Sequence, residues 1–232
     1  MTVLSAIQQA CTVIGLEKPD SVFGSTEREH VELADLANEI GERIAKAAEW
    51  RVLAAVETIT GDAVTTAWPL PADYDRMTKD SKVWLSTYQT PATRISSLDD
   101  WLEREVREID FLYNAWIIFG GNMNIKPELA VGATAKFYYQ QNTFVRASDN
   151  TRKAAFDNDG DSFMLDERML RLGIIWQWKE TKGLPYAEDM TNFEMLQSKR
   201  IAEDAGAKEI KMGRVRLPRG VENAYPFSIS ES

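Results

Sequence analysis

The chain has 232 residues, of which 44% are hydrophobic and 27% are charged, a composition typical of a globular protein rather than a disordered one. Its 27 basic and 36 acidic side chains give a formal net charge of −9. This balance disfavours a protein that reads nucleic-acid sequence, because such proteins usually lean basic. It does not exclude a duct through which DNA slides, since an acidic wall repels phosphate.

The residue types that build several common sites are scarce. The single cysteine, Cys11, excludes a disulfide within the chain, and together with the single histidine, His30, it leaves no ligand set for a zinc site. No phosphate-binding loop or nucleotide motif occurs, so we expect no cofactor. We also expect neither a signal peptide nor a membrane span, because no long apolar run is present. The sequence thus predicts a soluble protein of a reducing compartment.

Residues 1–50 have the hydrophobic spacing of two amphipathic helices. The first is expected to end at Gly15, since glycine favours a left-handed C-cap, and Cys11 falls on its apolar stripe. Thr26 and Glu29 form a capping-box pattern that predicts where the second begins. The expected inner face of the second helix consists of Leu33, Leu36, Ala37, Ile40, Ile44 and Ala47. Its opposite face carries the acids Glu32, Asp35, Glu39, Glu42 and Glu49.

Residues 51–146 change to the two-residue spacing of strands. Residues 52–60 and 65–68 flank a Gly-Asp turn, which predicts a hairpin. Ser97 is expected to cap a short helix, and residues 120–122 to close a second hairpin. The expected buried side of the short helix consists of Leu98, Trp101, Leu102 and Val106.

The remaining residues are helical and then extended in pattern. Asp166 is expected to cap a helix that ends at Gly183, and Pro185 separates it from a second helix. The fold class we predict is α+β. A helical bundle is formed by N-terminal helices (1–50) and a C-terminal helical hairpin (147–206), with an inserted small antiparallel β module (51–146) and an extended C-terminal arm (207–232).

Two acidic clusters suggest chemistry and also have a plainer interpretation. Asp157, Asp159 and Asp161 alternate as calcium ligands can, but Gly160 and Arg168 do not fit the positions of an EF-hand loop. A polar loop before a helix explains them equally well. The acids Asp99, Asp100, Glu103 and Glu105 are spaced for general acid–base work or for a solvated helix face.

Several local strings carry a family resemblance. Residues 70–77 read LPADYDRM, residues 165–170 LDERML, residues 176–179 WQWK and residues 182–189 KGLPYAED. In these strings and in its layout, the chain resembles the head-to-tail adaptor proteins of tailed bacteriophages, also called tail accessory or head completion proteins. The resemblance covers about residues 1–220, and its motifs concern packing and turns rather than catalysis.

The resemblance implies a structural virion protein rather than an enzyme. Such adaptors form a ring, usually of twelve copies, that docks on the portal protein at the capsid vertex. The expected location is the virion, between head and tail, and the host cytoplasm during assembly. Tail or nozzle proteins bind below, and genomic DNA passes through the ring without sequence-specific binding. No membrane is involved.

The resemblance also implies roles for two segments. The arm would bind the portal through Lys208, Lys211, Arg214, Arg216, Arg219, Tyr225 and Phe227. The acids Glu32, Asp35, Glu39 and Glu42 would line the channel, although an ordinary solvated helix face explains them as well.

Two further hypotheses about function remain. One is a hydrolase, acting on peptidoglycan or metal-assisted, that uses residues 157–161. The other is a binding module unrelated to virions.

Overall fold

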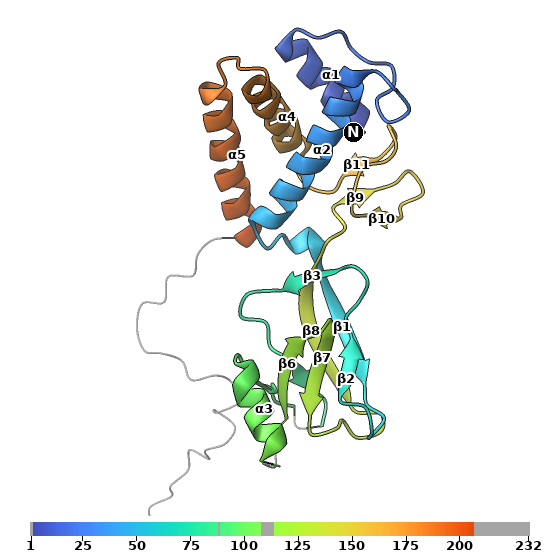
Figure 1. Cartoon of the computed structure of the whole chain (residues 1–232), viewed down its shortest axis with the longest axis vertical. Helices are drawn as coiled ribbons and strands as arrows, with labels where there is room; N and C mark the ends of the chain where they lie inside the picture. The colour runs from blue at the N-terminus through green and yellow to red at the C-terminus, as the bar shows by residue number, and fades with distance from the viewer. Residues whose placement is uncertain (1, 88, 108–113, 207–232) are drawn as a thin grey trace, which may run out of the picture. The chain divides into compact units, whose positions relative to one another are not determined.

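The computed structural model describes residues 2–87, 89–107 and 114–206, and the chain divides into two compact units (Figure 1). The first, here called the helical unit, comprises Met1–Glu57, Pro69–Ser81 and Phe137–Gly206. The second, here called the β unit, includes Thr58–Trp68 and Lys82–Lys136. Five helices and several small sheets confirm the α+β class within the described residues. The expected arm, residues 207–232, lies outside them.

Four helices and a short 3₁₀ turn form most of the helical unit. They are α1 (Val3–Ile14), α2 (Arg28–Ala47), α4 (Glu167–Thr181), α5 (Ala187–Ala205) and η1 (Arg51–Leu53). Helix α1 ends at Gly15, whose φ of 81° suits glycine, and α4 begins at Asp166, whose carboxylate accepts from the Arg168 amide. Both caps confirm the sequence predictions. The buried faces of α1, α2 and α4 share one core with Phe193 of α5.

Helix α2 departs from the prediction at both ends. It begins at Arg28 with Glu27 as N-cap, so the expected capping box is wrong. Instead, the Ser25 hydroxyl accepts the Glu27 amide at 3.2 Å, which places the polar cap earlier in the chain. At the other end Ala45 is buried and Ala47 is exposed. By the helical period Ala47 lies on the same face as Ile40, but it is the last residue of α2, so the helix ends where the expected inner face would continue.

Three sheets contain the strands. A four-stranded sheet has the order β1 (Ala54–Thr60), β8 (Thr134–Gln141) and β3 (Tyr74–Met77), with β4 (Trp84–Leu85) also paired to β8. Both β3 and β4 run antiparallel to β8. A second has the order β10 (Arg152–Lys153), β9 (Val145–Arg146) and β11 (Ser162–Phe163). A third has the order β2 (Ala67–Pro69), β7 (Asn122–Lys126), β6 (Ala115–Phe119) and β5 (Thr93–Arg94), with β5 parallel to β6.

The two predicted hairpins have different outcomes. The one closed by residues 120–122 is confirmed, since β6 and β7 pair antiparallel around it. The one closed by Gly61 is wrong, because β2 pairs with β7 and not with β1. The Gly61 amide donates to the Ala133 carbonyl at 2.8 Å, and a Cβ at position 61 would lie 2.5 Å from that of Leu129. The chain therefore turns against the loop that leads into β8.

Helix α3 (Leu98–Val106) is capped by Ser97 as predicted, but its burial differs. Trp101 is 3% exposed and packs with Ile95, Ala115 and Ile117. The other residues of the expected buried side face solvent: Leu98 is 59% exposed, Leu102 56% and Val106 74%.

Candidate assembly surfaces

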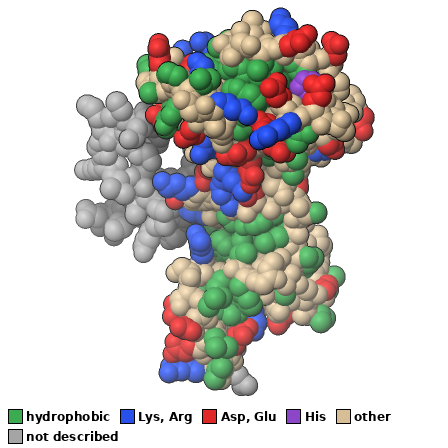
Figure 2. Space-filling view, turned by 45° about the horizontal axis from the view of Figure 1, so that its top comes forward, with side chains coloured by type: hydrophobic (Ala, Val, Ile, Leu, Met, Phe, Trp, Pro, Cys, Tyr) green, Lys and Arg blue, Asp and Glu red, His purple; other side chains and the backbone are tan. Residues whose placement is uncertain are grey.

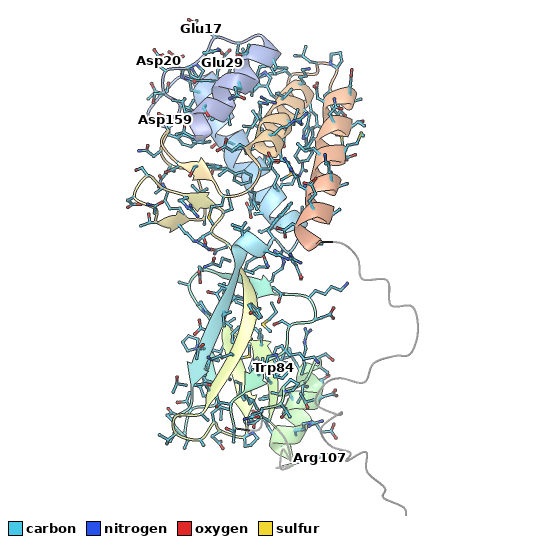
Figure 3. All side chains as sticks on the ribbon, turned by 180° about the vertical axis from the view of Figure 1, so that it is seen from behind. Glu17, Asp20, Glu29, Trp84, Arg107 and Asp159 are labelled. Carbon is cyan, nitrogen blue, oxygen red and sulfur yellow. The ribbon has the colours of Figure 1, made fainter. Side chains whose placement is uncertain are left out.

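The acidic loop before α4 is held by the chain's own donors. Asp159 accepts hydrogen bonds from the Ser21 hydroxyl at 2.5 Å and from the amides of Val22 at 2.9 Å and Phe23 at 3.2 Å. Burial alone would raise the pKa of Asp159, but these three hydrogen bonds outweigh it and hold the pKa below its usual range. Asp159 therefore ties its loop to the segment between α1 and α2, at the end of the helical unit where Glu17, Asp20 and Glu29 also lie (Figure 3).

Asp161 and Asp157 share one cation. Asp161 is 2% exposed, and its carboxylate contacts the Lys153 ammonium at 2.7 Å and accepts the amides of Asp157 and Asn158 at 3.1 Å each. Lys153 also forms an ion pair with Asp157, which lowers the pKa of that carboxyl. The three aspartates suggested as calcium ligands thus act in two separate contacts, Asp159 in one and the Lys153 pair in the other. Within the described part of the chain, no three acidic, histidine or cysteine side chains are grouped to hold a metal ion.

Two of the four acids of α3, Glu103 and Glu105, pair with neighbouring side chains. Glu105 accepts from the Lys126 ammonium at 2.8 Å and from the Trp101 indole at 3.0 Å, and the Lys126 contact lowers the pKa of Glu105. Glu103 forms an ion pair with Arg107 at 2.8 Å. A general acid needs a raised pKa, so the lowered value at Glu105 is opposite to what that chemistry requires.

The acidic face of α2 contacts α4. Glu32 accepts from Lys182 at 2.6 Å and from Arg28 at 2.8 Å, and these contacts lower its pKa. Glu39 accepts from the Gln177 amide at 2.5 Å. Asp35, between them in sequence, is exposed. Figure 2 shows acidic side chains gathered over the helical unit, with basic side chains interspersed among them.

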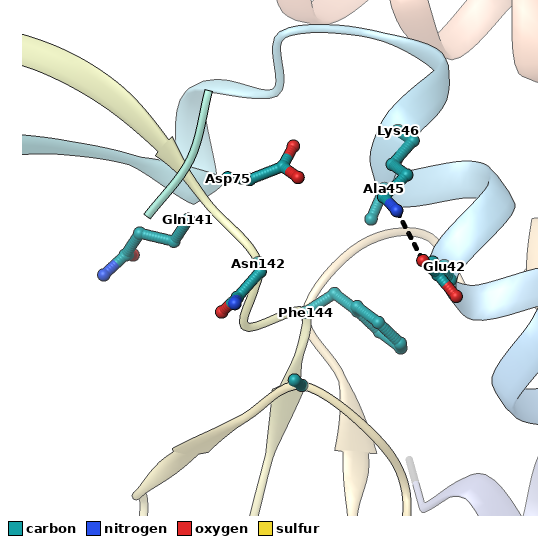
Figure 4. Close-up of a pocket in the computed structure, with 8 residues that line it drawn as sticks. Glu42, Ala45, Lys46, Asp75, Gln141, Asn142 and Phe144 are labelled. Atoms are coloured by element: carbon teal, nitrogen blue, oxygen red, sulfur yellow. Dashed lines mark hydrogen bonds and ion pairs between the residues drawn. The ribbon is translucent and has the colours of Figure 1, made fainter. Parts of the chain in front are cut away.

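A cavity of about 350 Å³ lies near the end of α2, within the helical unit (Figure 4). It is lined by Glu42, Ala45, Lys46, Asp75, Gln141, Asn142, Phe144 and Ala154. Glu42 and Lys46 form an ion pair at 2.5 Å on its wall. Neither Cys11 nor His30 lines the cavity: Cys11 is buried in the core, where burial raises its pKa, and His30 contacts the Ser25 hydroxyl at 2.8 Å. The lining contains no serine, threonine, cysteine or histidine.

The three exposed apolar residues of α3, Leu98, Leu102 and Val106, are here called the α3 stripe. Sequence spacing could not reveal that this stripe is exposed, since residues four apart share a helix face whether that face is inside or outside. The expected portal-binding residues belong to the arm. Lys208, Lys211, Arg214, Arg216, Arg219, Tyr225 and Phe227 all lie outside the described residues.

Comparison with known proteins identifies the family. The family model described as SU10 adaptor protein matches residues 1–219, which is nearly the whole chain. No curated protein matches the chain. Among the described residues, no helix combines the length and apolar character needed to cross a bilayer. The suspected resemblance is thereby confirmed: the chain belongs to the SU10 adaptor protein family, the structural head-to-tail adaptors of bacteriophages.

Proposed function

We propose that this chain forms a ring on the portal protein at the capsid vertex, joins the capsid to the tail, and surrounds part of the DNA channel. The observation that carries the proposal is the family match over residues 1–219. The contacts of Asp159, Asp161 and Glu105 support it, because these charges stabilise the chain's own loops and helices instead of facing a substrate site.

The proposed portal-binding element is the arm, residues 207–232. Residues 206–220 carry five basic side chains and one acid, and Tyr225 and Phe227 follow. Aromatic anchors supply large buried area in interfaces, and arginine pairs strongly with carboxylates. The arm follows Gly206, the C-cap of α5, and Arg51 donates to the neighbouring Ala205 carbonyl at 2.9 Å.

Deleting residues 207–232 tests the arm. The circular dichroism spectrum should stay nearly unchanged, because the deletion leaves every described helix intact, while co-sedimentation with purified portal rings should be lost. The matched control replaces exposed lysines elsewhere, Lys18→Gln with Lys79→Gln and Lys82→Gln, and should bind portal normally. Normal portal binding by the truncated chain would overturn the arm assignment.

The proposed channel lining is the acidic face of α2. Because Asp35 and Glu39 keep negative charge toward solvent, replacing both with lysine should slow genome ejection by attracting DNA phosphate, and added salt should relieve the effect. Glu194→Lys with Glu188→Lys on α5 is the control of equal charge. If both double variants slow ejection equally, α2 does not line the channel.

A further inference from the structure

The strongest unexplained surface in the described chain is the α3 stripe. Leu98, Leu102 and Val106 recur every four residues and lie within one side of a nine-residue helix, with more than half of each side chain open to water. The opposite side of α3 is fixed to the β unit by the buried Trp101 and by Glu105. The stripe is thus held on a rigid helix with its apolar side outward.

Acidic residues border the stripe. Asp99 and Glu103 each follow a stripe residue by one position, so they flank it on the surface of the helix. Asp99 makes no ion pair with any described residue, and Glu103 pairs only across the exposed surface with Arg107. Residues 98–107 contain four acidic side chains and two arginines, so the net charge of this stretch is negative. A segment that fits this surface needs aliphatic or aromatic anchors together with basic groups.

The chain contains one such segment outside the described residues. Residues 206–220 have a net charge of +4, and Tyr225, Phe227 and Ile229 then alternate as apolar anchors. Gly206, where this segment starts, lies beside the turn that leads into β1, because Arg51 contacts both Asp204 and Ala205. From Gly206, an extended chain can carry Tyr225 about 60 Å, twice the roughly 30 Å diameter of a small domain.

We propose that in the free protein the C-terminal arm, residues 207–232, lies on the α3 stripe of its own chain, with Tyr225 and Phe227 on the apolar residues and the basic residues beside Asp99 and Glu103. Tethering makes this contact effective even if it is weak, since a linked segment has an effective concentration in the millimolar range. The further consequence, that the portal must displace the arm from α3, rests on the proposed function.

Cross-linking of the full chain tests the contact. Because the only native cysteine, Cys11, is buried, a disulfide formed in a variant with two introduced cysteines comes from that pair. Leu102→Cys with Phe227→Cys should form a disulfide within one chain under mild oxidation, seen as a faster band on a non-reducing gel. The matched control, Val131→Cys with Phe227→Cys, uses a residue of the same unit that is 79% exposed and should form little of it. Equal yields for both pairs, or covalent dimers in place of the internal cross-link, would overturn the proposal.

Hydrogen–deuterium exchange supplies a second measurement on variants that keep the fold. Leu102→Asp should increase exchange across residues 220–230, and Tyr225→Ser with Phe227→Ser should increase exchange in α3. Val131→Asp should change neither. If α3 exchange is the same with and without the aromatic anchors, residues 108–113 or another copy cover the stripe and the proposal is wrong. Portal binding separates this result from the proposed function: Leu102→Asp should still bind portal, whereas arm truncation should not.

Discussion

A Cβ built on Gly173 would lie 2.3 Å from Cγ2 of Ile40, so α4 and α2 approach each other more closely than any side chain at position 173 allows. Gly173→Ala should therefore lower the free energy of unfolding by about 1–3 kcal/mol through overpacking. The gain in helix propensity that alanine brings to a helix interior, about 1 kcal/mol, offsets part of this cost and leaves a net loss of up to about 2 kcal/mol.

Urea unfolding followed by circular dichroism measures the effect of Gly173→Ala. The control is Gly24→Ala, where a new Cβ meets its nearest atom, the Ser21 hydroxyl, at an ordinary 3.6 Å. A Gly173→Ala protein as stable as the parent would mean that the two helices separate without cost.

Lys153 supports a buried carboxylate. Lys153→Met should destabilise the fold by about 3 kcal/mol, since removing one partner leaves the Asp161 charge buried without its cation. Adding Asp161→Asn to Lys153→Met should restore part of the loss, because the charge is then gone. The same measurement on Lys46→Met should show a change below about 0.5 kcal/mol, as its ion pair with Glu42 is exposed. Failure of the double variant to recover stability would contradict the ion-pair explanation.

The hydrogen bonds of the Asp159 carboxylate should make the folded chain less stable in acid. Its pKa is lower in the folded chain than in the unfolded one, so its contribution is complete above the unfolded value of about 3.8 and disappears as pH falls through the folded value. Asp159→Asn should be less stable than the parent by about 1–2 kcal/mol at pH 7. The gap should close below pH 4, which thermal melts at several pH values will show. A gap that is constant with pH would indicate packing rather than charge.

Two adjacent tyrosines on β8 provide an internal comparison. Burial, together with the hydrogen bond that its hydroxyl donates to Asp73 at 2.9 Å, raises the pKa of Tyr139 to about 12. Tyr139→Phe should cost about 1–2 kcal/mol by leaving Asp73 short of a donor. Tyr138→Phe removes an exposed hydroxyl and should change stability little. Chemical denaturation of both variants tests this, and equal stabilities would refute a role for the Asp73 contact.

The sequence predicted best where structure depends on neighbours along the chain. Gly15, Ser97 and Asp166 were identified as caps because capping involves residues within one turn. The β6–β7 hairpin was found for the same reason, since its turn residues specify it locally. In contrast, the choice of β7 rather than β1 as the partner of β2 depends on how Gly61 packs against Leu129, a contact across many residues of chain.

At the candidate surfaces, too, local features could be predicted from the sequence and contacts between distant residues could not. The acids of α2 could be placed on one face by counting, but the contacts of Glu32 with Lys182 and of Glu39 with Gln177 come from α4 and have no local pattern. The α3 stripe was missed because the spacing of Leu98 and Leu102 is the same for a buried face and an exposed one. The role of Lys153 was missed because nothing in the sequence pairs it with Asp161.

Arg51 anchors the end of α5, just before the arm, by two hydrogen bonds. Its main-chain amide holds the Asp204 carboxylate at 2.9 Å, and its guanidinium holds the Ala205 carbonyl, so the last turn of α5 is fastened to the turn that opens β1. Tension on the trailing segment would be shared between two stretches of backbone far apart in sequence, and would not simply unwind the helix from its end. In the proposed function the arm joins this chain to the portal, so the Arg51 contacts lie where such a load would enter the fold.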